Sequence, residues 1–316
     1  MPKWTINDIP NQNGRIAIVT GANSGLGLIT AKELARKGAH VVMAVRNTTK
    51  GEAARDEIRA EVPDADLKLM TLDLASLDSI HSFAKAFKAE YDHLDLLINN
   101  AGVMAIPRRE TADGFEMQFG TNHLGHFALT GLLLDCLVDR PDSRVVTITS
   151  VAAWQGEFVP DARIKFDDLN REESYSRYGA YGQAKRANAL FGFELERRLR
   201  AMNAQTISVV AHPGLSHTNL QTTSTEHSGN QLEAAVYAIL LPVMAQSAEM
   251  GTLPQLYAAT APNVKGGEFY GPAMMARGYP KRISGPRGVK NTQDAARLWE
   301  ASEEMTGVRY EVAVRT

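Results

Sequence analysis

Tyr181 and Lys185 are the residues of this sequence whose types and spacing most directly point to chemistry. Side chains four positions apart lie on one face of a helix, so this phenol and this ammonium can form an acid/base pair. A free tyrosine has a pKa of about 10, and its use as a base near pH 7 requires roughly 4 kcal/mol of selective phenolate stabilisation, part of which an ammonium supplies. Of the nine tyrosines, only Tyr181 has Lys at the fourth following position. The spacing alone is weak evidence, so its meaning depends on the rest of the chain.

A glycine-rich segment follows the first apolar run. Residues 20–27 read Thr-Gly-Ala-Asn-Ser-Gly-Leu-Gly and precede a helical pattern. The spacing differs from the G-x-G-x-x-G of many dinucleotide-binding proteins, but the physical requirement is the same: a tight turn, close backbone approach to a pyrophosphate, and free N–H groups at a helix N-terminus. We therefore predict a cofactor phosphate site here, with a plain strand-to-helix turn as the alternative. The expected contacts are Gly21, Asn23, Ser24, Gly25, Leu26 and Gly27.

The end of the second apolar run indicates which ribose the cofactor carries. In dinucleotide-binding folds an acidic residue about 20 positions beyond the glycines binds the 2′-hydroxyl of NAD. This chain has Arg46 and Asn47 there instead of an acid. A guanidinium can clamp a 2′-phosphate through charge-assisted contacts, and Lys50 can assist. The pattern favours NADP(H) over NAD(H), and the alternative is that Arg46 pairs with a surface acid.

Strand-like and helix-like segments alternate along most of the chain, and they must position these residues. Apolar, β-branched runs predict strands at 16–20, 41–45, 67–72, 94–98, 145–149, 206–210 and 267–270, and amphipathic stretches between them predict helices, among them 115–138, 180–202 and 292–305. This order predicts an α/β fold, namely a Rossmann-type doubly wound parallel sheet of about seven strands in the order 3-2-1-4-5-6-7 with helices on both faces. Ligands then bind at the carboxyl ends of the strands.

The same pattern predicts one domain over residues 1–316, because no Pro/Gly/Ser-rich linker divides it. Residues 1–14 are expected to lead into the first strand, and residues 261–316 to form a C-terminal extension on the substrate side. A polar stretch over 154–178 predicts an excursion at the sheet edge. Residues 215–231 are rich in polar and small residues, which is typical of a substrate lid or, alternatively, of a disordered surface loop.

Composition argues against several classes of partner. Lysine plus arginine number 34 against 36 acids, so the net charge of −2 provides no general attraction to nucleic acid or to anionic membrane. The first fifteen residues lack the pattern of a secretion signal, and the longest apolar run is too short for a membrane anchor, so we expect a cytoplasmic location. The single cysteine, Cys136, lies in an apolar pattern and is expected to be a core residue.

Four short motifs occur in a fixed order along the chain. They are the glycine-rich segment at 20–27, Asn-Asn-Ala-Gly at 99–102, Ser150 after the fifth strand, and the Tyr181 and Lys185 pair. Together, over roughly the first 220 residues, they resemble the short-chain dehydrogenase/reductase family far more specifically than any one motif would. The segments 44–47, 122–127 and 166–170, and the 31-residue interval from Ser150 to Tyr181, are similar to the retinol-dehydrogenase-like branch.

The resemblance implies an oxidoreductase that interconverts an aldehyde or ketone and an alcohol by hydride transfer. Tyr181 is then the general acid/base, Ser150 orients the substrate oxygen, and Lys185 lowers the pKa of Tyr181 and holds the nicotinamide ribose. Asn122 positions a water that links Lys185 to solvent. The family's cofactor contacts fall on Tyr181, Lys185, Asp73, Leu74, Asn100, Ala101, Gly102, Pro213, Gly214 and Thr218.

Several alternatives stay open at this point. Ser150 could simply bond the backbone at a strand end, and Asn122 could be satisfied within its helix. Trp154 and Phe158 are expected to contact a moderately apolar substrate, although such aromatics more often pack. No metal site is expected, because His123 and His126 lack a third ligand and fit a packing role better. The presence of both Tyr181 and Lys185 favours an enzyme over a non-catalytic, redox-sensing NADP(H)-binding regulator. The spacing of the glycines disfavours a sugar epimerase. A homo-oligomer is compatible with the family.

Overall fold

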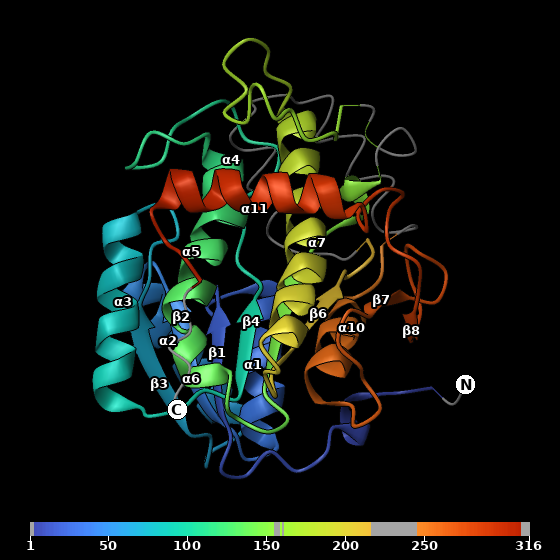
Figure 1. Ribbon diagram of the computed structural model, residues 1–316. Helices are drawn as coiled ribbons and strands as arrows, with labels where there is room; N and C mark the ends of the chain where they lie inside the picture. The colour runs from blue at the N-terminus through green and yellow to red at the C-terminus, as the bar shows by residue number, and fades with distance from the viewer. Residues whose placement is uncertain (1–2, 155–158, 160, 216–244, 311–316) are drawn as a thin grey trace.

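The sheet forms the centre of the molecule. The computed structural model describes residues 3–154, 159, 161–215 and 245–310. In that part of the chain the strands are β1 (Ile16–Thr20), β2 (His40–Val45), β3 (Leu67–Thr71), β4 (Leu96–Asn99), β5 (Arg144–Ile148), β6 (Ile207–Ala211), β7 (Phe269–Pro272) and β8 (Pro280–Arg282). They form one sheet in the order β3-β2-β1-β4-β5-β6-β7-β8 (Figure 1). The predicted order of seven strands is confirmed, and β8 adds a short antiparallel edge strand that was not predicted.

Strands covered on both faces need apolar residues on both faces, and β1 shows this arrangement. Ala17 and Val19 enter one core with α1 (Gly25–Arg36), α2 (Thr48–Glu61) and α10 (Ala248–Thr260). Ile18 enters the opposite core, which α3 (Leu77–Glu90), α5 (Gly125–Leu132) and α7 (Arg177–Ala201) cover. The expectation of helices on both faces is therefore confirmed.

A further helix, α11 (Thr292–Thr306), lies across the outer side of α5 and α7 (Figure 1). Its Trp299 is 2% exposed and meets Phe127 of α5 edge to face, with ring centroids 5.1 Å apart. The same indole stacks on Phe191 of α7 at 5.8 Å, and Tyr310 closes the group at 4.4 Å from Trp299. The expected C-terminal extension thus contributes a layer over these two helices.

The segment predicted as helical over 115–138 is divided in the structure. It contains α4 (Met117–Phe119), a π-helical turn η2 (Gly120–Leu124), α5 and α6 (Leu134–Leu137). Glu116 caps the start of α4, because its carboxylate accepts the backbone N–H groups of Gln118 and Phe119 at 3.0 and 2.7 Å. Gly125 packs directly on the Leu74 carbonyl, which a Cβ atom would approach to 2.4 Å. The local cap and the tertiary contact of Gly125 set the breaks, and a periodicity of apolar residues reports neither.

Short 3-10 turns lie at Ile6–Asp8 (η1) and Val151–Ala153 (η3). No described helix is both long and apolar enough to cross a bilayer. Three predictions lie outside the described residues: Phe158, Thr218 and all of the 215–231 segment except Leu215.

Candidate active site

The candidate site lies where the central strands end. β1 ends at Thr20, β4 at Asn99 and β5 at Ile148, and these parallel neighbours place their carboxyl ends at one edge of the sheet. The chain leaves that edge through the glycine-rich turn, through residues 100–102 and through Ser150. The motifs that are distant in the sequence are therefore adjacent in space, as expected at the switch point of a doubly wound sheet.

The glycine-rich turn has the geometry that a pyrophosphate requires. Gly21 has a φ of +67°, a region that other residues rarely adopt. A Cβ atom on Gly27 would lie 2.3 Å from the Gly21 carbonyl oxygen and 2.7 Å from Asn100 Nδ2. Ser24 stands at the N-cap of α1, and its side chain makes no cap hydrogen bond, so it leaves the first N–H groups of α1 open toward the turn. A side chain at Gly27 would fill this cradle, whereas a phosphate beside the bare backbone fits it.

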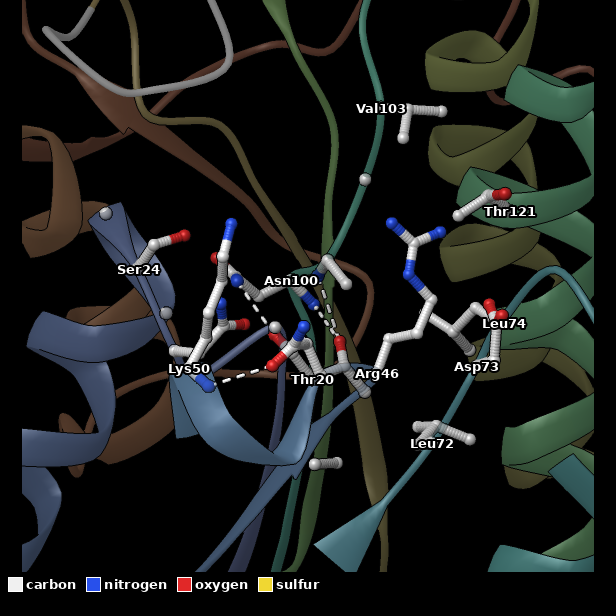
Figure 2. Close-up of a pocket in the computed structure, with 18 of the residues that line it drawn as sticks. Thr20, Ser24, Arg46, Lys50, Leu72, Asp73, Leu74, Asn100, Val103 and Thr121 are labelled. Carbon is white, nitrogen blue, oxygen red and sulfur yellow. Dashed lines mark hydrogen bonds between the residues drawn. The ribbon is translucent and has the colours of Figure 1, made fainter. Parts of the chain in front are cut away.

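A cavity of about 360 Å³ opens above this turn, and Figure 2 shows the side chains that surround it. Thirteen predicted cofactor contacts line it: Gly21, Asn23, Ser24, Gly25, Leu26, Gly27, Arg46, Asn47, Asp73, Leu74, Asn100, Ala101 and Gly102. It is also lined by Thr20, Ala44, Lys50, Leu72, Val103 and Thr121, of which the sequence indicated only Lys50. Thr20, Ala44 and Leu72 lie at strand ends, so their positions next to predicted contacts could have identified them. Val103 and Thr121 come from a loop and the π turn, whose directions no periodicity fixes.

Arg46 and Lys50 bring two cations to the lining of the cavity, the guanidinium on the side of Asp73 and Thr121 and the lysine on the side of Ser24 (Figure 2). Both side chains are exposed, and Arg46 has no acidic partner among the described residues. Asn47 caps α2, because its Oδ1 accepts the Lys50 backbone N–H at 2.9 Å. Asp73 holds its own turn, since its Oδ1 accepts the Ala75 N–H at 3.0 Å. The two exposed cationic groups are thus available for an anion, while the two short polar residues shape the wall.

Tyr181 lies in the second turn of α7 and is 7% exposed. Burial raises the pKa of its phenol, and a hydrogen bond with Ser150 acts in the opposite direction. Ser150 ends the β5 exit, where its hydroxyl also accepts the Ala152 N–H at 3.3 Å. Ser150 therefore does bond the backbone at the strand end, as the alternative proposed. The same hydroxyl is also hydrogen-bonded to Tyr181, the candidate acid.

Lys185 follows one turn later, and its Nζ donates to the Ile148 carbonyl at 3.1 Å. The ammonium lies 5.9 Å from the centroid of the Tyr181 ring. Burial lowers the pKa of Lys185 to about 8. The expected fall in the pKa of Tyr181 is not seen in this chain alone, because the cost of burying a phenolate outweighs the favourable contacts. In this state Tyr181 holds its proton.

Asn122 lies in the π turn and is fully buried. Its Oδ1 accepts the Val103 N–H at 2.8 Å, and its Nδ2 donates to the Val103 carbonyl at 2.9 Å. Gly102 separates it from Lys185: a Cβ on this glycine would lie 2.9 Å from Asn122 Oδ1 and 3.5 Å from Lys185 Nζ. The side-chain amide thus braces the loop after β4 beside the lysine.

The remaining predicted residues lie around the end of β6. Gly214 donates its backbone N–H to His212 Nδ1 at 3.1 Å, and the Pro213 carbonyl accepts from Gln246 at 2.9 Å. Trp154 is 6% exposed and packs against His212 and Phe269, with ring centroids 5.3 and 5.7 Å away. The structure therefore places Trp154 in an aromatic group under the end of the sheet, near Ser150 but packed.

The polar stretch before α7 contains a buried residue that sequence reasoning missed. Arg171 is fully buried and pairs with Asp161. Its Nε donates to Gln183 Oε1 at 3.0 Å, two positions beyond Tyr181. The predicted excursion is thus fastened to α7, the helix that carries the candidate acid. An arginine among Asp and Glu residues was the only sequence signal for this contact.

Comparison with known proteins agrees with this geometry. A sequence model described as short chain dehydrogenase matches residues 15–160. Retinol dehydrogenase 12 of Homo sapiens is 39% identical over 300 residues, which cover 94% of this chain and 88% of that protein. The chain belongs to the short-chain dehydrogenase/reductase family. Within the family it is retinol-dehydrogenase-like, since retinol dehydrogenase 13 of Homo sapiens is also 39% identical and covers 93% of this chain and 85% of its own length.

Solved structures share this fold. The crystal structure of an uncharacterized protein from Mycobacterium paratuberculosis is 42% identical, with a TM-score of 0.80 over 98% of this chain and 100% of that chain. The NADP complex of Pseudomonas aeruginosa RhlG, 22% identical, has a TM-score of 0.63 over 83% of this chain and 95% of its own. Membership in the short-chain dehydrogenase/reductase family makes this chain an oxidoreductase for carbonyl and alcohol groups that uses a nicotinamide cofactor.

Proposed function

We propose that the chain is an NADP(H)-dependent carbonyl reductase and alcohol dehydrogenase in which Tyr181 is the general acid/base. The observation that carries the proposal is the convergence of Tyr181, Ser150 and Lys185 beside a cavity with a phosphate-binding turn. A regulator that only sensed the cofactor would have no use for a buried tyrosine hydrogen-bonded to Ser150. We therefore favour the enzyme over the non-catalytic alternative.

In the reductive direction, bound NADPH supplies a hydride to the carbonyl carbon. Tyr181 donates its hydroxyl proton to the developing oxyanion, for which its raised pKa keeps it protonated at neutral pH. Ser150 donates a hydrogen bond to the same oxygen and holds it in line with the phenol. Lys185, which has three donor sites and is seen to use one for Ile148, offers the others to a ribose hydroxyl. In oxidation the proton returns to Tyr181.

The preference for NADP(H) is supported by the charge at the ribose end of the cavity. Arg46 and Lys50 both line the cavity, and a 2′-phosphate between them would replace water around the two cations with charge-assisted contacts. The wall also contains Asp73, whose carboxylate is engaged in its own turn. An unphosphorylated ribose would leave the two cations without a partner in the complex.

The substrate we propose is a small, moderately apolar aldehyde or ketone. The relatives named retinol dehydrogenase make a retinoid aldehyde one candidate, and the aromatic group around Trp154 suits an apolar ligand nearby. A cytoplasmic location belongs to the same proposal, and fractionation of cells that express the chain tests it.

The test is turnover with a panel of aldehydes and ketones, including a retinoid aldehyde, followed by the oxidation of NADPH. Tyr181→Phe should lower kcat by about 100- to 10,000-fold, the usual contribution of a positioned acid, while NADPH still binds. Tyr91→Phe is the matched control, because Tyr91 follows α3 and is hydrogen-bonded to His40 at the start of β2, at the opposite edge of the sheet from the site, and this variant should turn over normally. Equal, cofactor-dependent rates for Tyr181→Phe and the wild type would refute the role of Tyr181. NADPH binding without turnover of any panel member would instead favour the regulator.

A further inference from the structure

His126 is a buried residue of α5 to which the mechanism above gives no task. It is 1% exposed, and both of its ring nitrogens have partners. Nδ1 lies 2.9 Å from the backbone carbonyl oxygen of Asn122, and Nε2 lies 2.9 Å from Thr20 Oγ1. One imidazole thus joins the π turn that holds Asn122 to the last residue of β1, directly before the glycine-rich turn.

The partners fix the tautomer of the ring. A carbonyl oxygen can only accept a hydrogen bond, so Nδ1 carries the proton. Burial lowers the pKa of His126 to about 4, and the nearby Lys185 ammonium acts in the same direction. The ring is therefore neutral at physiological pH, and Nε2 must accept. It follows that Thr20 donates its hydroxyl proton to His126.

The Thr20 hydroxyl oxygen also accepts hydrogen bonds from the segment that follows β4. The donors are the backbone N–H groups of Asn100 and Ala101, each at 2.9 Å. Asn100 also donates from its side chain to the Thr20 carbonyl at 2.9 Å. A directed chain of hydrogen bonds therefore runs from the exit of β4 through Thr20 and His126 to Asn122. A hydroxyl donor freed from His126 has only the Ile98 carbonyl as a second acceptor, at a longer 3.3 Å.

We propose that His126 is a positioning residue that couples the cofactor-binding turn to the Asn122 and Lys185 side of the reaction centre. Its Nε2 fixes the Thr20 hydroxyl so that residues 100 and 101 keep their place in the cavity wall. Its Nδ1–H fixes the π turn so that the Asn122 amide keeps its hold on Val103, next to Lys185. The part of this inference that concerns turnover rests on the proposed function, whereas the part that concerns cofactor binding does not.

Two substitutions separate the halves of the imidazole. His126→Gln can place an amide oxygen near the position of Nε2 and keep the contact with Thr20, whereas His126→Asn can keep a donor near Nδ1 for the Asn122 carbonyl. His126→Asn should weaken NADPH binding, measured by fluorescence titration, by about fivefold, the usual effect of one neutral hydrogen bond, with a smaller change in kcat. His126→Gln should leave the Kd for NADPH within about twofold but lower kcat and shift its pH profile. His123 is the matched control, because it is equally buried one turn earlier and bonds Ser302 instead of the site.

Thr20 supplies the second arm. Thr20→Val should weaken NADPH binding as His126→Asn does, whereas Thr20→Ser, which keeps the hydroxyl, should bind NADPH like the wild type. The double variant Thr20→Val/His126→Asn should bind NADPH no more weakly than the weaker-binding single variant. Two outcomes would overturn the coupling and reduce His126 to a packing residue. One is that the effects of the Thr20 and His126 substitutions on NADPH affinity multiply in the double variant. The other is that both His126 variants and the His123→Gln control lose NADPH affinity and kcat to the same extent. Failure of the wild type to turn over any carbonyl would refute the proposed function, while the NADPH titrations would still decide the coupling.

Discussion

Lys185→Met should make the protein more stable and inactive at the same time. Lys185 is 5% exposed, and burial lowers the pKa of its ammonium from the ordinary 10.5 to about 8. Below pH 8 the lysine is protonated in both the folded and the unfolded chain, so the folded state carries the full cost of the buried charge. Between pH 8 and 10.5 the folded lysine loses its proton while the unfolded one keeps it, so this cost declines, and above 10.5 it is absent.

The size of the effect follows from the two pKa values. Their difference of about 2.5 pH units corresponds to about 3 kcal/mol of unfolding free energy. Methionine keeps the aliphatic stem in the same space. The Ile148 carbonyl, which loses its bond from Lys185, still accepts from Asn188 Nδ2 at 3.1 Å. We therefore expect Lys185→Met to raise the free energy of unfolding by up to about 3 kcal/mol at pH 7.

Denaturant titrations of the protein without cofactor, at intervals from pH 6 to pH 10.5, test this expectation. The difference between variant and wild type should be constant below pH 8 and vanish near pH 10.5. Lys85→Met on the exposed face of α3 is the control and should show no such trend. A variant that is less stable than the wild type at every pH, or a difference that does not change with pH, would show that the buried ammonium is not the destabilising group.

Three further outcomes are expected. Arg46→Ala should reduce the preference for NADPH over NADH in kcat/KM by about 10- to 150-fold, since a hydrogen bond to a charged group contributes about 1.5–3 kcal/mol; an unchanged ratio would refute the assignment of Arg46. Gly27→Ala should weaken NADPH binding by about 10- to 100-fold in a fluorescence titration, because the added methyl meets the Gly21 carbonyl at 2.3 Å and must displace it. Trp299→Ala should lower the free energy of unfolding by about 3–5 kcal/mol in denaturant titrations, because it empties the space between α11 and the two helices below it; a loss under 1 kcal/mol would mean that α11 is not held through this residue.

Much of the framework was predictable because its signals are local. Alternating apolar runs and amphipathic stretches predicted seven strands in their order. Gly27 predicted a close approach of the backbone at the glycine-rich turn. The cofactor contacts predicted between Gly21 and Gly102 all line the cavity. These features depend on neighbours in sequence or on the general rules of parallel sheets, so one chain is sufficient to infer them.

The rest depends on contacts between distant segments. The π turn around Asn122 is set by its bonds with Val103 and by the packing of Gly125 on Leu74, neither of which has a periodic signature. The state of Tyr181 depends on how deeply α7 is buried, and burial raised a pKa that its lysine neighbour was expected to lower. The short strand β8 pairs antiparallel with β7 through only three residue pairs, too few for a pattern to predict.

The layer that α11 forms over α5 and α7 also has a consequence for biosynthesis. Phe127 and Phe191 are buried partly by Trp299 and Tyr310, which come late in the sequence. Trp299 follows Phe191 by about 100 residues, which is on the order of 5 to 20 seconds of translation. During that interval strands β1 to β5 and the helices that carry Asn122 and Tyr181 can already form, but an aromatic surface on the outer side of these helices is still uncovered. During this interval the uncovered aromatic surface of the nascent chain can bind a chaperone or a wrong partner. The interval ends when α11 leaves the ribosome and packs on α5 and α7.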